Sequence, residues 1–375
     1  MLRGFEGVRY ICAKQIVVFD IGSAYTKFGY AGEPTPLGII RTEVVCPETQ
    51  VIRKIYEYKN AEDLYELLVE FLHCLFFRHV VISPKDAKIV VLESPLTATV
   101  FRDTLANVMF RHFEIGSLMY LPTHLATIST LGTDTALVLD VGYEEATLIP
   151  IFEAVPILKA WQAVPLGGKV VNEYIKKELK KTYPNVEISE QTVENIKVRT
   201  CFVTTLERSN KLRSEDKPTP PPDVMYPGVK SINVSGEIRE GAYESLWDID
   251  ENEQSVSSII LDAILKCPLD TRKPLAENIL VIGGTAMAKG FASRLKSELL
   301  NLIKSDLYKY KLNIKTFKFH TAPSKSNYTA WLGGSIFGTA DLPLRCLTKE
   351  NYLKINRVPD WTSLIDNHRE ELCIL

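Results

Sequence analysis

The segment Phe19–Glu33 constrains the fold of this chain more than any other stretch. It reads FDIGSAYTKFGYAGE: an apolar run that begins at Ile16 ends in Asp20, turns through small residues and leaves as a second run. This pattern predicts two antiparallel strands joined by a tight turn. A related pattern, TALVLDVGYEEATLIPI, occupies Thr135–Ile151. The two copies predict a chain with two halves, the second opened by its own hairpin.

The turn of the first hairpin has the residue types that phosphate binding needs. Its small residues Gly22, Ser23 and Ala24 allow successive backbone N–H groups to point into one concavity. Lys27 adds a positive charge, and Asp20 can hold a hydrated Mg²⁺. One such hairpin is a weak signal, because its acid could simply cap the turn. Two matched hairpins, however, can clamp phosphates from opposite sides.

Motifs spread along the chain resemble the actin family. The paired Asp-x-Gly hairpins, together with Val281–Thr285, resemble the nucleotide-binding fold shared by actin, the heat-shock chaperones and sugar kinases. Other segments single out actin, in order and over nearly the whole chain. They are Leu92–Leu96 with Phe101–Arg102, Asn195–Lys197 with Cys201–Val203, Lys266–Asp270, and Ala330–Ile336. The resemblance implies a duplicated α/β fold with two lobes, four subdomains in all, around a central cleft.

The resemblance also implies the boundaries of these lobes. The first lobe is expected to comprise residues 1–130 and 329–375, with a shortened small subdomain at about 34–58. The second lobe is expected to comprise residues 131–328, with its small subdomain at about 167–253. A length of 375 residues is ample for two lobes with large cores.

Carried over position by position, the resemblance implies a site for ATP or ADP with Mg²⁺. Asp20 and Asp140 are the two acids expected to hold the hydrated metal. The residues expected to contact the nucleotide are Ser23, Ala24, Tyr25, Lys27, Gly142, Gly168, Lys197, Gly283, Gly284, Thr285 and Met287.

The second hairpin departs from actin at its turn. Glu144 stands where actin has a glycine, which restricts the backbone and can place a negative charge beside phosphate. Two unit charges about 4 Å apart repel by roughly 1 kcal/mol in bulk water and roughly 4 kcal/mol at the dielectric of a protein surface. Unless Glu144 points outward, nucleotide affinity should therefore fall.

The residues that orient the attacking water in actin are also replaced. Thr123 and Thr147 stand where actin has a glutamine and a histidine. Because phosphoryl transfer depends mostly on positioning and charge stabilisation, we expect ATP hydrolysis to be absent or very slow. On the base side of the site, actin's ribose-binding acid, stacking tyrosine and lysine are replaced by Val198, Ala288 and Asn327.

Within the family, the chain is similar to the actin-related subunit of dynactin's pointed-end complex. The segments that carry this similarity are Arg199–Val203, Tyr226–Pro227, Glu253–Val256 and Pro359–Trp361. The similarity implies a structural, non-enzymatic subunit that caps the pointed end of the centractin filament and seats other dynactin pointed-end subunits, indirectly supporting dynein-driven movement along microtubules. Two alternatives are a nuclear actin-related subunit of a chromatin-remodelling complex and an ATPase or kinase of the same fold.

The length of the small first subdomain bears on this role. Actin has there the loop by which one protomer grips the next, but the stretch from Glu33 to Glu93 is shorter here than in actin. We therefore expect the gripping loop to be missing or stunted. A chain with an intact body and no gripping loop can dock on a filament by one end only.

Composition excludes several other classes of protein. A net charge of -2 and a pI near 6.4 provide no basic field for nucleic acid. Seven scattered cysteines without C-x-x-C pairing disfavour a disulfide framework and a zinc site. The chain shows no signal-peptide core and no apolar run of membrane-spanning length. We expect a soluble protein of the cytoplasm and cytoskeleton, with neither nucleic acid nor membrane as partner.

Periodicity predicts further elements. Apolar residues between Asn60 and Phe77 recur at the spacing of a core helix. Ala98–Phe113 predicts another helix, with Arg102 and Arg111 in solvent, and Ile55–Tyr56 is expected to be strand-like.

Two polar segments are ambiguous by sequence. Lys217–Pro222 is expected to be a stiff surface loop rather than a ligand for an SH3-type domain, because its P-x-x-P pattern is so short. The tail that contains Trp361 could pack on the chain's own core or on a partner.

Overall fold

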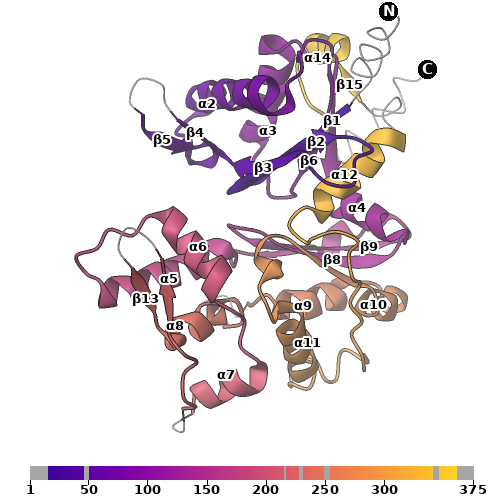
Figure 1. Cartoon of the computed structure of the whole chain (residues 1–375). Coiled ribbons are helices and arrows are strands. Elements are labelled where there is room, and N and C mark those ends of the chain that lie inside the picture. The colour runs from indigo at the N-terminus through magenta and orange to yellow at the C-terminus, as the bar shows by residue number, and fades with distance from the viewer. Residues whose placement is uncertain are drawn as a thin grey trace, which may run out of the picture. The chain divides into compact units, whose positions relative to one another are not determined.

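The computed structural model describes residues 16–45, 50–214, 217–227, 231–248, 254–340 and 346–360. The chain divides into two compact units, one made of residues 1–130 and 330–375 and the other of residues 131–329. In Figure 1 each unit contains a mixed β-sheet accompanied by helices. The predicted mixed α/β architecture is therefore confirmed.

A six-stranded sheet forms the centre of the first unit, in the order β15-β7-β6-β1-β2-β3. These strands are β1 (Ile16–Ile21), β2 (Tyr25–Tyr30), β3 (Gly38–Arg41), β6 (Lys88–Glu93), β7 (Ser117–Pro122) and β15 (Leu347–Thr348). Strand β1 pairs antiparallel with β2 and parallel with β6, which places Asp20 opposite Lys27 and Leu92. Val17, Val18 and Phe19 are fully buried, which explains the unbroken apolar run before the acid.

The helices of the first unit include the two that the sequence predicts, between Asn60 and Phe77 and at Ala98–Phe113. They are α2 (Ala61–Cys74) with its extension η2 (Leu75–Val80), α3 (Thr99–Asn107) with its extension η3 (Val108–His112), α4 (Thr123–Ile128) with η4 (Ser129–Leu131), α12 (Thr329–Ala340) and α14 (Lys349–Ile355). The side chain of Asn60 accepts a hydrogen bond from Asp63 N at 2.8 Å and so caps α2. The predicted core helix between Asn60 and Phe77 is confirmed.

A small hairpin of the first unit consists of β4 (Glu43–Val45) and β5 (Ile52–Lys54). The two strands are joined by only six residues, 46–51, of which 46–49 lie outside the described part of the chain. The strand expected at Ile55–Tyr56 is wrong, because these residues form the 3₁₀ turn η1 (Ile55–Glu57). The turn buries Ile55 and lets the Tyr56 ring stack on Phe101, with 4.6 Å between ring centroids.

Arg102 is buried, contrary to the expectation that it lies in solvent. Its exposed fraction is 6%, and its Nε lies 2.8 Å from Oε1 of Glu93, which is also buried. A second guanidinium nitrogen donates to the carbonyl of Pro359, and the group lies 5.1 Å from the Tyr120 ring centroid. A buried charge requires such partners, and these come from segments that helical periodicity cannot identify. Arg111 is exposed, as expected.

The sheet of the second unit repeats the pairing of the first. Its strands are β8 (Ala136–Val141), β9 (Ala146–Phe152), β10 (Val155–Pro156), β11 (Gln162–Val164) and β14 (Ile279–Ile282). Strand β8 pairs antiparallel with β9 and parallel with β14, so that Asp140 lies opposite Thr147 and Ile282. Each unit therefore has a hairpin whose first strand contains an aspartate near its end. That first strand also pairs with a parallel strand on its other side.

The remaining elements of the second unit are mostly helices. They are η5 (Leu158–Ala160), α5 (Gly168–Thr182), α6 (Glu190–Thr200), α7 (Leu206–Leu212), α8 (Gly236–Gly241), η6 (Glu244–Leu246), α9 (Ser258–Lys266), α10 (Leu269–Ala276), η7 (Thr285–Met287) and α11 (Phe291–Leu302), with a two-stranded sheet of β12 (Val224–Tyr226) and β13 (Ile232–Val234). The proline-rich loop, residues 217–222, is held by this unit: Arg208 Nη2 donates to Thr219 O at 2.8 Å, and Arg239 donates to Pro222 O.

Some expectations have no structural answer. The tail with Trp361 lies outside the described residues. Over the described ranges, none of the helices combines the length and the hydrophobicity that a bilayer crossing requires.

Candidate functional site

The turn of the first hairpin is held by its own backbone and by two neighbouring side chains. Gly22 N donates to Tyr25 O at 3.2 Å, which closes the turn. Thr42 Oγ1 donates to Gly22 O at 2.6 Å, and Tyr56 Oη donates to Ile21 O at 2.7 Å. The intervening amides of residues 23 and 24 have no hydrogen-bond acceptor among the described residues. They are therefore available to an anion.

Lys27 and Asp20 form an ion pair across this hairpin. Lys27 Nζ lies 2.9 Å from Asp20 Oδ2, and the strand register places the two residues directly opposite each other. The lysine thus brings positive charge to the turn while it neutralises the acid predicted to hold hydrated metal. Tyr25 begins β2, with the Arg41 guanidinium 5.9 Å from its ring centroid.

The turn of the second hairpin closes in the same way. Gly142 N donates to Glu145 O at 3.0 Å. The carbonyl of Gly142 accepts hydrogen bonds from Gly168 N at 3.0 Å and from Thr285 Oγ1 at 2.7 Å. Three residues predicted separately along the chain, Gly142, Gly168 and Thr285, are therefore in direct contact.

Gly283 brings the end of β14 against the same hairpin. Its φ is +100°, a conformation that favours glycine. A Cβ added there would lie 2.6 Å from Asp140 Oδ1 and would overlap the carbonyl oxygen of Val141. The next residue, Gly284, has open space where its Cβ would be. The two glycines therefore have different roles: the first permits close packing and the second leaves room.

Lys197 is a buried cation beside Gly168. A Cβ on Gly168 would lie 3.2 Å from Lys197 Nζ. That nitrogen donates to Glu194 Oε2 at 2.7 Å, and the same oxygen accepts from Asn172 Nδ2 at 2.9 Å. Burial lowers the pKa of Lys197, and Glu194 opposes this effect. Neither partner was predicted, although the i,i+3 spacing of Glu194 and Lys197 is a signal for such a pair.

Met287 is the last of the predicted contacts. It ends η7 with 47% of its surface exposed. It reaches this position three residues after Gly284, whose carbonyl accepts from Met287 N at 3.3 Å.

The Glu144 side chain forms an ion pair with a neighbouring lysine. Its Oε2 lies 2.9 Å from Lys169 Nζ, with the two side chains 40% and 48% exposed. This hydrogen bond raises the pKa of Lys169. Burial raises the pKa of the neighbouring Glu145, with a further contribution from Glu144. Lys169 therefore offsets the negative charge of Glu144, which we expected from the sequence to weaken phosphate binding.

Thr123 and Thr147, the two positions expected from the resemblance to replace water-orienting residues, are buried. Thr123 Oγ1 donates to Glu93 O at 3.0 Å, so its hydroxyl is occupied by the protein. Thr147 lies on β9 and is 4% exposed. A short hydroxyl side chain cannot extend as far as a carboxamide or an imidazole. Both observations agree with the expectation of absent or very slow hydrolysis, which remains a prediction.

The donors of each hairpin region suit phosphate differently. The first offers two open amides and Lys27, which fits an anion. The second has Lys197 Nζ close to Gly168, but the Gly168 amide and the Thr285 hydroxyl already donate to Gly142 O, and two glutamates lie in its turn. In the described part of the chain, three or more His, Cys, Asp or Glu side chains do not converge on a metal centre.

Comparison with known proteins agrees with the arrangement of hairpins and sheets. The model of the actin family matches residues 12–354. Actin-related protein 10 of Dictyostelium discoideum is 28% identical over 445 aligned positions, which cover 96% of this chain and 92% of that protein. The family match extends over both units. On this evidence, the chain belongs to the actin family.

Proposed function

We propose that this chain is a structural, non-catalytic actin-related subunit that caps the pointed end of dynactin's centractin filament. The observation that carries the proposal is the six-residue connection between β4 and β5. Head-to-tail contacts build an open filament only if each subunit offers both complementary surfaces. A subunit with a shortened gripping loop can join a filament through one surface and leave the other without a successor.

The similarity to an actin-related protein 10 supports an actin-related role over that of a filament-forming actin. In this role the chain binds the end of the centractin filament and seats the other pointed-end subunits of dynactin, in the cytoplasm and at the cytoskeleton. Its connection to dynein and to microtubule transport is indirect.

The proposed role includes a retained nucleotide, ATP or ADP with Mg²⁺. In the first unit, the open amides of Ser23 and Ala24 and the Lys27 ammonium fit phosphate. In the second unit, taken by itself, Lys197 beside Gly168 is a further cation. The acids Asp20 and Asp140 fit a hydrated Mg²⁺. A bound nucleotide supplies negative charge that these donors neutralise, and so stabilises the fold by mass action.

Single-filament fluorescence microscopy tests the capping role. Dye-labelled chain is added to preformed centractin filaments, followed by differently labelled centractin. We expect the chain at one end of each filament and no further growth at that end. Binding along the filament sides, growth at capped ends, or polymerisation of the chain alone would each contradict the proposal.

Nucleotide content and turnover are separate measurements. Pure chain is denatured, and the released nucleotide is quantified by chromatography, while phosphate release is followed on native chain. We expect bound ATP or ADP and no turnover above the buffer rate. Brisk ATP turnover would exclude the non-catalytic role, and an empty protein would exclude the nucleotide without affecting the capping test.

A further inference from the structure

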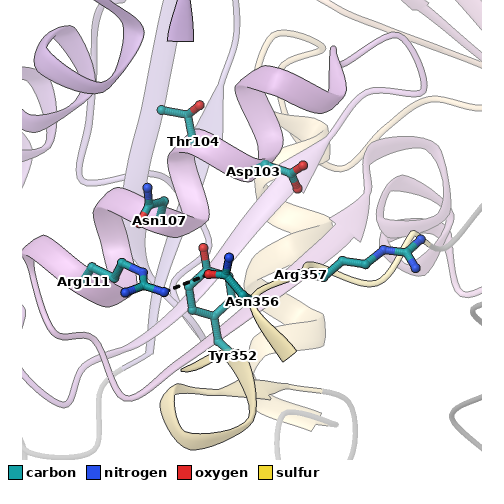
Figure 2. Close-up of a pocket in the computed structure, with 7 residues that line it drawn as sticks. All are labelled: Asp103, Thr104, Asn107, Arg111, Tyr352, Asn356 and Arg357. Carbon is teal, nitrogen blue, oxygen red and sulfur yellow. Dashed lines mark hydrogen bonds between the residues drawn. The ribbon is translucent and has the colours of Figure 1, made fainter. Parts of the chain in front are cut away.

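The first unit contains an open pocket that none of the predicted nucleotide contacts lines. Its volume is about 580 Å³. Figure 2 shows the residues that line it: Asp103, Thr104, Asn107, Arg111, Tyr352, Asn356 and Arg357. They come from α3 and η3 on one wall and from α14 and the residues after it on the other. The pocket therefore belongs to one unit alone.

The two walls are fixed relative to each other. Asp103, Asn107 and Arg111 are spaced four residues apart, which places them on one face of the α3–η3 helix. Arg111 Nη2 donates to Asn356 Oδ1 at 2.8 Å and so bridges the walls, as the dashed line in Figure 2 shows. Tyr352 is buried and its ring stacks on Phe110, with 4.6 Å between centroids. The pocket is thus preformed.

Asn107 is the least satisfied side chain of the lining. Its Oδ1 is buried and has no hydrogen-bond partner among the described residues. A buried polar atom without a partner costs about 1–3 kcal/mol. A carboxamide offers both a donor and an acceptor, and the two can exchange places by rotation of the group. A ligand in the pocket can therefore supply the missing hydrogen bond.

The charges of the lining favour an anionic ligand. Two arginines, Arg111 and Arg357, and one acid, Asp103, line the pocket, and Figure 2 shows the two guanidinium groups lying apart from each other. Guanidinium groups pair well with carboxylates and phosphates. Because the two guanidinium groups lie apart, they suit a ligand with carboxylates at several places along its length better than one compact phosphate group. The opposing acid also suits a ligand that presents amide or amine donors beside its carboxylate, as a peptide does.

From this geometry we propose that the pocket binds an acidic segment of a partner protein. One side-chain carboxylate of that segment accepts hydrogen bonds from Arg111, a second carboxylate accepts them from Arg357, and an amide of the segment pairs with Asn107. The volume is within the range of ligand sites, about 300–1,000 Å³, and holds a few residues of an extended peptide. The surface is a docking site additional to the filament end, and it does not depend on a bound nucleotide.

Fluorescence anisotropy with fluorescein-labelled hexaglutamate tests this assignment on the full chain. The variants are Arg357→Glu, Arg111→Glu and Asn107→Ala, and the matched control is Arg199→Glu, which reverses an exposed arginine on α6 of the second unit. We expect each pocket arginine variant to weaken binding at least about tenfold, which corresponds to about 1.4 kcal/mol. The control variant should bind within about twofold of the unaltered chain.

The Asn107→Ala variant distinguishes a specific contact with the peptide from nonspecific electrostatic attraction. It leaves the net charge unchanged, so a loss of hexaglutamate affinity with an undiminished melting temperature supports a direct contact. Arg111→Glu also breaks the hydrogen bond to Asn356, and Arg357→Glu provides the second test if that variant does not fold.

Three outcomes would overturn the proposal. The first is absence of hexaglutamate binding by the unaltered chain, and the second is an equal loss in Arg199→Glu and Arg357→Glu, which would indicate nonspecific attraction. The third is competition by free glutarate at the same concentration as hexaglutamate, which would identify a small carboxylate as the ligand rather than a peptide.

Discussion

In the β1–β2 hairpin the turn residues are Gly22-Ser23-Ala24-Tyr25, and in the β8–β9 hairpin they are Gly142-Tyr143-Glu144-Glu145. The glycine N–H of each turn donates to the carbonyl three residues later, at 3.2 Å and 3.0 Å. The backbone therefore keeps its shape while the side chains change from small and neutral to large and acidic. Turn geometry alone is therefore not evidence of phosphate binding, because the same backbone turn can have side chains that attract phosphate or side chains that repel it.

The surroundings of the two turns differ as well. Side chains of Thr42 and Tyr56 fasten the first turn, whereas the second is backed by Gly283 and by the start of α5. The first turn thus depends on side-chain hydrogen bonds, and the second depends on close approach of backbone.

The largest expected effect is on the backbone support of the second hairpin. Gly283→Ala places a methyl group against Val141 and Asp140 at a φ of +100°, so we expect the free energy of unfolding to fall by roughly 2–4 kcal/mol. Gly284→Ala, which adds the same group in open space, should change it by only about 0.5 kcal/mol. Urea denaturation measures both. Equal effects of the two substitutions would refute the close-packing account.

Next in size is the contribution of the first hairpin's lysine to nucleotide affinity. Lys27→Ala removes a charged donor at the turn, so we expect Mg-ATP to bind about 10- to 100-fold more weakly, from the 1.5–3 kcal/mol typical of charged hydrogen bonds. Lys169→Ala should cost less, because the Lys169 side chain is 48% exposed and that of Lys27 only 17%, so solvent screens the charge of Lys169 more strongly. Titration calorimetry compares the two, and a larger loss in Lys169→Ala would reverse the assigned importance of the hairpins.

A smaller effect should follow from making the second turn resemble the first. Glu144→Gly removes a negative charge and frees Lys169, so we expect Mg-ATP affinity to rise roughly fivefold, on the scale of about 1 kcal/mol between exposed charges. Glu144→Gln removes the charge and keeps the side chain, which separates electrostatics from backbone freedom. Unchanged affinity in both variants would show that this turn does not face phosphate.

The smallest effect concerns Glu145, which occupies the turn position of Tyr25. Burial raises the pKa of Glu145 in the folded state above its ordinary value of 4.5. At a pH above the raised pKa, the buried carboxylate is charged and destabilises the fold. Below pH 4.5 the carboxyl group is protonated in both the folded and the unfolded state, and this destabilisation disappears. Glu145→Gln should therefore raise the melting temperature at pH 7 and leave it unchanged near pH 4. The exposed Glu173→Gln serves as control, and a gain independent of pH would disprove this explanation.

Both hairpins could be predicted because every signal they need is local. The apolar run, the acid and the small turn residues of Phe19–Glu33 lie within one short stretch. The contacts around Gly168 could be predicted only through family resemblance, because Gly142, Lys197 and Thr285 are far apart in sequence. The structure brings them together by the parallel pairing of β8 with β14 and by the packing of α5 with α6.

Arg102 shows why other predictions failed. We expected this residue of the Ala98–Phe113 helix to lie in solvent. Its partners, however, lie on other segments: Glu93 at the end of β6, and Pro359 near the C-terminus. An ion pair between remote segments leaves no periodic signal. The turn at Ile55–Tyr56 failed for a related reason: its residue types favour strands, but burial of Ile55 and stacking of Tyr56 decide its conformation.

The proline-rich loop has a practical consequence for anyone who modifies this protein. Residues 217–222 have the composition of a linker. Such a composition suggests a site at which a fluorescent tag or an affinity label could be inserted. However, Arg208 and Arg239 hold it, and a Cβ on Gly236 would overlap the carbonyl oxygen of Pro221. An inserted tag would therefore detach the loop from β12 and α8, and labels belong at other positions of the chain.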